Sequence, residues 1–105
     1  MNRKAIKMSD EKFTQGEWRA EIEDHELADT GDYVTDFSVV TDKTGIAQCF
    51  DNSVISEEQA AANCHLISAA PEMYECVCDA LTDLEMPDGM RNHFEAVLKK
   101  ARGEE

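Results

Sequence analysis

Apolar and charged residues alternate near the start of the patterned part of this sequence. Apolar side chains stand at positions 18, 20 and 22, and Arg or Glu stands between and after them. A period of two is typical of a half-buried β-strand, so we expect a strand that begins near Gly16. The following stretch, 24–32, is acidic and rich in turn-forming residues, which predicts a loop between strands.

Two further strands are expected before the middle of the chain. Residues 33–41 are rich in aromatic and β-branched side chains, which favour a strand. Residues 42–45 then predict a short turn in which Gly45 is free to adopt a positive φ. A third strand follows over 46–50. Three antiparallel strands in sequence order form a meander.

The pattern changes to a helical one at Ser56. Ser56 and Gln59 stand three positions apart, the spacing of a capping box, in which each side chain bonds the backbone of the other residue. Apolar residues then recur at intervals of three and four. Pro71 interrupts them, and proline disfavours helical geometry at the preceding residue. We therefore predict two helices, near 56–69 and 71–84.

A last helix is predicted between Asp88, which could cap it, and Gly103, which would end it. The expected fold is α+β: a three-stranded antiparallel meander followed by two or three helices packed on one face. Residues 1–15 lack a sustained pattern and are expected to form a flexible N-terminal arm. Residues 16–103 are expected to form a single domain.

The net charge of the chain excludes more classes of function than its other composition does. The chain has 10 basic and 23 acidic residues, a formal charge of −13. Two bases and ten acids fall in residues 16–55, and four bases and eleven acids in 56–105, so the excess is not confined to a tail. Such a surface repels nucleic acid and anionic membranes and attracts basic surfaces. Direct nucleic-acid binding is therefore not expected. The acidic surface could serve a basic partner, or it could serve only to keep the protein soluble, which is the simpler explanation.

No catalytic, metal or cofactor motif stands out. Cys64 and His65 are adjacent on a predicted helix and diverge by about 100°, which disfavours a nucleophile pair. Cys76 and Cys78 diverge by about 200°, so the four cysteines are interpreted as buried small hydrophobes. No apolar run reaches the ~20 residues of a membrane span. The start lacks the apolar stretch of a secretory signal, so we expect a cytoplasmic protein. Because no catalytic motif is found, we expect that it is not an enzyme.

Two segments carry a resemblance to a known group of proteins. Residues 60–75, AAANCHLISAAPEMYE, resemble the "ANARLIAAAPELLEAL" segment of many short phage and prophage proteins. Residues 14–18, TQGEW, are similar to the "TPGPW" that opens their first strand, and residues 43–47 match the turn between later strands. The resemblance covers roughly residues 14–82. It implies a phage-encoded accessory protein made in the infected bacterial cell, with no catalytic residues to transfer.

The leading hypothesis is an inhibitor that binds a basic host protein or nucleoprotein complex in the host cytoplasm. Its carboxylates would mimic nucleic acid, as in an anti-CRISPR-like anti-defence protein. The candidate partner-binding residues are all acidic, and for any single one of them a role as a solvated surface residue is the simpler interpretation. They are Glu21, Glu23, Asp24, Glu26, Asp29, Asp32, Glu72, Glu75, Asp79 and Asp83.

Two alternatives belong to other classes of protein. A small-molecule or metal-binding protein would need an apolar pocket, for which the candidate residues are Trp18, Tyr33, Cys64 and His65. A homo-oligomeric structural protein, for example a homodimer, would bury its helical stripe against a second copy.

Overall fold

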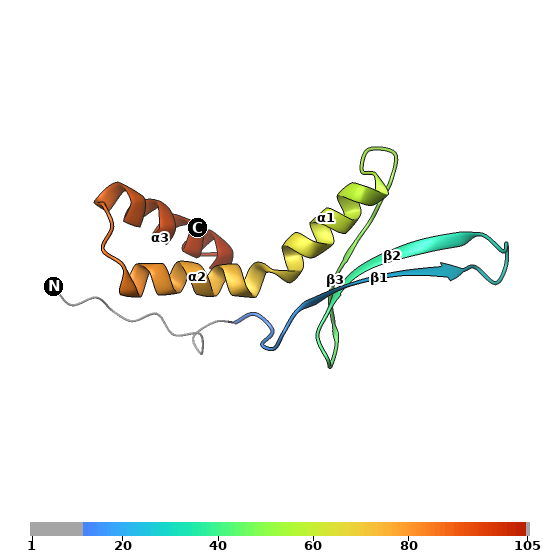
Figure 1. Ribbon diagram of the computed structural model, residues 1–105, viewed down its shortest axis with the longest axis horizontal. Coiled ribbons are helices and arrows are strands. Elements are labelled where there is room, and N and C mark those ends of the chain that lie inside the picture. Colours follow the sequence, from blue (N-terminus) through green and yellow to red (C-terminus); the bar gives the residue numbers. More distant parts are fainter. Residues whose placement is uncertain (1–11, 105) are drawn as a thin grey trace. The chain divides into compact units, whose positions relative to one another are not determined.

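The computed structural model describes residues 12–104, which form three strands followed by three helices (Figure 1). In chain order these are β1 (Arg19–Glu26), β2 (Tyr33–Val40), β3 (Gly45–Cys49), α1 (Glu57–Ser68), α2 (Ala70–Asp83) and α3 (Asp88–Arg102). The predicted α+β class and the order of the elements are confirmed. Most of the predicted flexible arm, residues 1–11, lies outside the described residues.

The described chain divides into two compact units. The first, here called the sheet unit, spans residues 14–70 and holds the three strands and α1. The second, called the helical unit, comprises residues 12–13 and 71–104 and holds α2 and α3. Each unit has its own cluster of buried side chains.

The sheet has the strand order β1-β2-β3, and all its pairs are antiparallel, as in the predicted meander. β1 and β2 pair along their whole length, from Arg19 opposite Val40 to Glu26 opposite Tyr33. β3 is shorter and pairs only with residues 37–40 of β2. The β1–β2 hairpin therefore extends beyond β3 as a two-stranded ribbon, as Figure 1 shows. We call residues 23–36 the hairpin arm.

Two local predictions in this region were wrong. Residues 24–26 were expected in a loop, but they continue β1 and pair with β2. Their polar character misled because these strand residues are exposed and need no apolar face. Gly45 was expected to adopt a positive φ, yet it lies in β3, and the glycine with positive φ in a hairpin loop is Gly31 at 75°. The loop is closed by the Leu27 N–H, which donates to the Asp32 carbonyl at 2.7 Å.

The core of the sheet unit lies between the sheet and α1. Phe37 and Val39 of β2 and Ala60 and Cys64 of α1 are buried together, as expected for one face of a strand against one face of a helix. The register places Ala20 of β1 opposite Val39, and Ala20 also packs against this cluster. The predicted alternation thus directs the even-numbered positions of β1 towards α1 where the sheet is covered.

The predicted start of α1 is confirmed. The Ser56 hydroxyl accepts a bond from the Gln59 backbone N–H at 3.2 Å, and Gln59 Oε1 accepts one from the Ser56 N–H at 2.9 Å. A cap of this kind contributes about 1 kcal/mol to helix stability. α1 ends at Ser68 with Ala69 as its C-cap, so the break predicted from Pro71 is present.

The core of the helical unit joins one face of α2 to α3. Tyr74, Cys78 and Leu81 of α2 are buried with Leu98 of α3. Phe13 packs edge-on against the Tyr74 ring, with the ring centroids 5.3 Å apart. The three buried α2 positions are separated by four and three residues, the spacing of one helical face.

Two arginines of α3 bind α2. Arg91 donates to the carbonyl oxygens of Leu81 at 3.1 Å and Leu84 at 3.3 Å, which satisfies backbone acceptors at the end of α2. The Arg102 Nε–H donates to the Tyr74 hydroxyl at 2.6 Å, and the guanidinium carbon lies 5.7 Å from the Tyr74 ring centroid. Both cations therefore stabilise the contact between the two helices.

The two ends of α3 agree only partly with the ends predicted from the sequence. Gly103 ends the helix in the left-handed conformation, with φ 71°, as predicted. Asp88, however, is not the N-cap. Pro87 occupies that position, no side chain caps the helix, and Asp88 is the first helical residue. Its carboxylate still lies at the positive end of the helix dipole, where it is favourable.

Candidate functional site

The hairpin arm gathers most of the acidic residues predicted in the first half of the chain. Its six carboxylates belong to Glu23, Asp24, Glu26, Asp29, Asp32 and Asp36. The chain has no Lys or Arg between residues 20 and 42. All residues from 21 to 33 are exposed, and Asp36 is half-buried. The arm is thus a thin ribbon with negative charge and without basic residues other than His25.

The register of the hairpin decides which carboxylates share a face. Side chains alternate along a strand, and same-face neighbours lie about 6.6–6.8 Å apart. Asp24 and Glu26 therefore lie on the face that α1 covers nearer the core, and Glu23 lies on the opposite face. Asp36 of β2 is directly opposite Glu23 on the neighbouring strand. Like charges so placed repel each other.

Few groups compensate these charges. His25 Nδ1 lies 3.3 Å from Asp36 Oδ2, which is an ion pair only when the imidazole is protonated. The Thr35 hydroxyl, a neutral donor, donates to Asp24 Oδ1. The other four arm carboxylates form no ion pair with any residue in the range 12–104. Among the described residues, the negative charge of the arm is therefore largely unbalanced.

Glu21, the remaining predicted acid of the first half, lies outside the arm. It pairs with Ser38 in the three-stranded part of the sheet and is exposed. Nearby, Arg19 forms an ion pair with Asp42. Arg19 and Lys43 are the two basic residues of the sheet unit, and both flank the acidic stretch rather than interrupt it.

The other four predicted acids form a second surface, on α2. Glu72, Glu75, Asp79 and Asp83 are separated by three, four and four residues, so they share one helical face. All four are exposed, on the side away from the buried Tyr74. These four acids belong to the helical unit and the arm belongs to the sheet unit, so the protein has two separate acidic surfaces.

Sequence reasoning missed Asp36. It lies inside a segment that was interpreted as a strand because of its apolar residues, and strand position alone does not reveal its neighbours. Its place opposite Glu23 is set by a register in which residues 24–26 continue β1, and these residues were expected in a loop. The signal was therefore cross-strand register rather than any local motif.

The residues proposed for a small-molecule pocket differ in their surroundings, and Trp18 packs against the core cluster of the sheet unit. Tyr33 is 75% exposed, Cys64 is fully buried in the core, and His65 is exposed on α1. The Cys64 thiol donates to the Ser38 carbonyl at 2.9 Å, and burial is the main cause that raises its pKa above the ordinary thiol value. A buried thiol held in its protonated form is a poor nucleophile.

The other cysteines and possible ligands give a mixed picture. Cys64 and Cys78 are buried, as predicted, whereas Cys49 is only half-buried and Cys76 is exposed. Its place on the outer side of α2 follows from the divergence of the two positions on the helix. Within residues 12–104, no group of three or more His, Cys, Asp or Glu side chains could hold a metal ion. No helix in that range is long and apolar enough to cross a membrane.

The fold and the site define a small acidic α+β protein with an exposed, negatively charged hairpin. Residues 1–105 match the family described as Salmonella phage P22 protein Y8K6, so the chain belongs to this phage protein family. The predicted phage origin is thereby confirmed, while the particular sequence pattern that suggested it is not tested. No curated protein and no solved structure matches the chain.

Proposed function

We propose that this phage protein binds a basic surface of a host protein or nucleoprotein complex through the hairpin arm. It would act in the cytoplasm of the infected cell and compete with nucleic acid for that surface, as an anti-defence inhibitor of the anti-CRISPR type does. The observation that carries the proposal is the concentration of unbalanced, exposed carboxylates on a ribbon with one His and no Lys or Arg.

The charge density of the arm supports mimicry of nucleic acid. The paired part of the arm is four residues long on each strand, or about 13 Å at ~3.3 Å per residue. It carries four carboxylates, and the loop adds two more. One strand of DNA carries one charge per ~3.4 Å of helix axis, or about four over the same length. The paired part of the arm therefore equals a single nucleic-acid strand in charge per length.

The shape of the arm supports the same function. A two-stranded ribbon is narrow enough to enter the major groove of DNA, so it also suits protein channels of similar width. A host protein that binds nucleic acid must keep such a channel positively charged. An acidic ribbon exploits that requirement, because the partner cannot lose its cations without losing its own ligand.

The experiment compares two variants with equal loss of charge. The arm variant carries Glu23→Gln, Asp24→Asn, Glu26→Gln, Asp29→Asn and Asp32→Asn. The control variant carries Glu72→Gln, Glu75→Gln, Asp79→Asn, Asp83→Asn and Glu95→Gln, all on exposed positions of the helical unit. Four of these are the α2 acids that the sequence also offered for partner binding, and the proposal places them outside the contact. Both are used to capture partners from host lysate over a salt series, and the captured protein is then purified for competition against its nucleic acid.

We expect the wild type to capture a basic nucleic-acid-binding protein, with affinity that falls steeply as salt rises. The arm variant should bind at least about tenfold more weakly, whereas the control should change by less than about threefold. Equal weakening in both variants would mean that net charge matters and the arm does not. Capture that is insensitive to salt would contradict the proposal. A stable dimer without any host partner would also contradict it and would favour the assembly alternative.

A further inference from the structure

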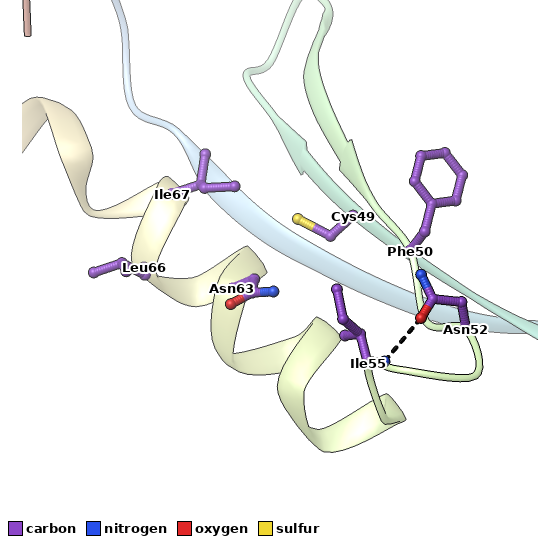
Figure 2. Close-up of a pocket in the computed structure, with 7 residues that line it drawn as sticks. All are labelled: Cys49, Phe50, Asn52, Ile55, Asn63, Leu66 and Ile67. Carbon is purple, nitrogen blue, oxygen red and sulfur yellow. Dashed lines mark hydrogen bonds between the residues drawn. The ribbon is translucent and has the colours of Figure 1, made fainter.

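An open apolar groove lies in the sheet unit, between the end of β3, the loop that follows it and α1 (Figure 2). Its volume is about 400 Å³. Small-molecule sites span roughly 300–1,000 Å³ and enclose most of their ligand, so this open groove suits a single large side chain better. The lining residues are Cys49, Phe50, Asn52, Ile55, Asn63, Leu66 and Ile67.

The groove has apolar side chains that the fold leaves uncovered. Phe50 at one wall is 65% exposed and Leu66 at the other is 62% exposed. Val54, in the loop beside the groove, is 83% exposed. Large apolar side chains of this kind that gather at one place, with polar residues around them, mark contact surfaces.

The two polar residues of the groove differ in their state. The Asn52 Oδ1 accepts bonds from the backbone N–H groups of Val54 and Ile55, at 2.7 and 2.8 Å, and so shapes the loop. The carboxamide of Asn63 points into the groove from α1 (Figure 2) and has no hydrogen-bond partner among residues 12–104. Asn63 can therefore bond the backbone of an incoming segment, as donor and acceptor.

The charge of the sheet unit indicates which kind of segment the groove would bind. The sheet unit has twelve acidic and two basic residues, a net charge of −10 with His neutral. Between residues 44 and 70 it has acids at 51, 57 and 58 and neither Lys nor Arg. A second copy would bring the same −10 to the contact, and like charges of this size oppose association. A basic segment would instead be attracted to the groove by the acidic residues of the sheet unit.

We infer that the groove receives one large apolar side chain from a basic segment of the partner, while the hairpin arm binds further cations of the same partner. This inference rests on the proposed function and adds a specificity element to it. Charge attracts many basic surfaces alike, whereas an apolar side chain seated in a groove selects the partner that presents it.

The test uses two synthetic peptides and the full-length protein. One peptide alternates Lys and Ser and has a single central Phe; the other has Ala at that position. Binding is followed by the amide chemical shifts of the protein. We expect both peptides to shift the arm, and only the Phe peptide to shift Cys49, Asn63 and Leu66 as well. The Phe peptide should bind about tenfold more tightly, since burial of an aromatic ring adds to the charge attraction.

A groove variant and a matched control complete the design. Leu66→Ala should weaken the Phe peptide about threefold to tenfold and leave the Ala peptide unchanged. Leu84→Ala removes a comparably exposed leucine, 56% against 62%, from the helical unit and should change neither peptide. Because Leu66 is largely exposed, its variant should keep the wild-type spectrum elsewhere.

Each failure has a distinct meaning. Equal affinity for the two peptides, or an unchanged affinity of Leu66→Ala, would overturn the groove inference and leave the arm proposal intact. Groove shifts that depend on protein concentration without peptide would show that a second copy fills the groove, which would also overturn it. Loss of both peptides in the arm variant is expected; tight binding of both by that variant would instead contradict the proposed function.

Discussion

In the helical unit, two arginines form hydrogen bonds that hold α2 and α3 together. Arg91 donates to carbonyl oxygens at the end of α2, and Arg102 bonds Tyr74 from the end of α3. The sheet unit uses its few cations differently. Arg19 pairs with Asp42, whose side chain is 89% exposed, and the pair lies outside the core. Within residues 12–104, arginines of the helical unit join two helices, whereas Arg19 of the sheet unit pairs with an exposed carboxylate at the surface.

Net charge separates the units in the same way. Residues 12–13 and 71–104 hold five bases and eight acids, a net of −3, whereas the sheet unit carries −10. The carboxylates of the arm contribute nothing to the core cluster of Phe37 and Val39. Repulsion between them opposes folding. The comparison teaches that the stability of the fold does not explain the arm charges, and this agrees with the partner that we propose.

The largest expected effect tests whether the two cores are separate. Phe37→Ala should destabilise the sheet unit by about 3–5 kcal/mol, because it removes a buried aromatic ring and leaves a cavity. Hydrogen exchange should rise more in residues 19–68 than in 70–102. The control, Tyr33→Ala, removes a 75% exposed ring from the same strand and should cost less than about 1 kcal/mol.

An equal rise of exchange in both units would break the comparison. It would mean that the two clusters unfold together, and residues 16–103 would then behave as the single cooperative domain predicted from the sequence.

A smaller effect tests the different use of arginine. Arg102→Met should cost about 1 kcal/mol, because it removes the bond to Tyr74 and the cation–π contact while keeping the apolar stem. Arg19→Met should cost no more than about 0.5 kcal/mol, since exposed ion pairs contribute little. The midpoints of urea unfolding measure both. Equal costs would show that the two arginines do not differ in role.

The smallest effect has the opposite sign. Glu23→Gln should raise stability by about 0.5 kcal/mol, because it removes a like-charge pair across the hairpin from Asp36. The gain should shrink as salt rises. Glu95→Gln, on the exposed side of α3, should change stability by only a few tenths of a kcal/mol and serves as control. A loss of stability in Glu23→Gln would show that the arm charges do support the fold.

Most of the secondary structure was predictable because its signals are local. The capping box at Ser56, the interruption at Pro71 and the left-handed end at Gly103 each depend on a few neighbouring residues. The errors lie where a distant partner decides the structure. Residues 24–26 form a strand only because β2 supplies its hydrogen bonds. The N-cap of α3 is Pro87, although Asp88 has the higher propensity for that position. Capping propensity alone therefore did not locate the start of the helix.

The candidate site divides in the same manner. The acidic residues, their number and the absence of Lys and Arg among them are properties of the sequence alone. That six of them stand on one ribbon, with Asp36 opposite Glu23, depends on antiparallel register and on the short length of β3. The groove beside Leu66 and Asn63 depends on how α1 and the loop after β3 lie against each other. Sequence determined which charges and helix ends the protein has, because those are local properties. Tertiary structure decided which side chains meet and which stay exposed, because pairing and packing join residues that lie far apart in the chain.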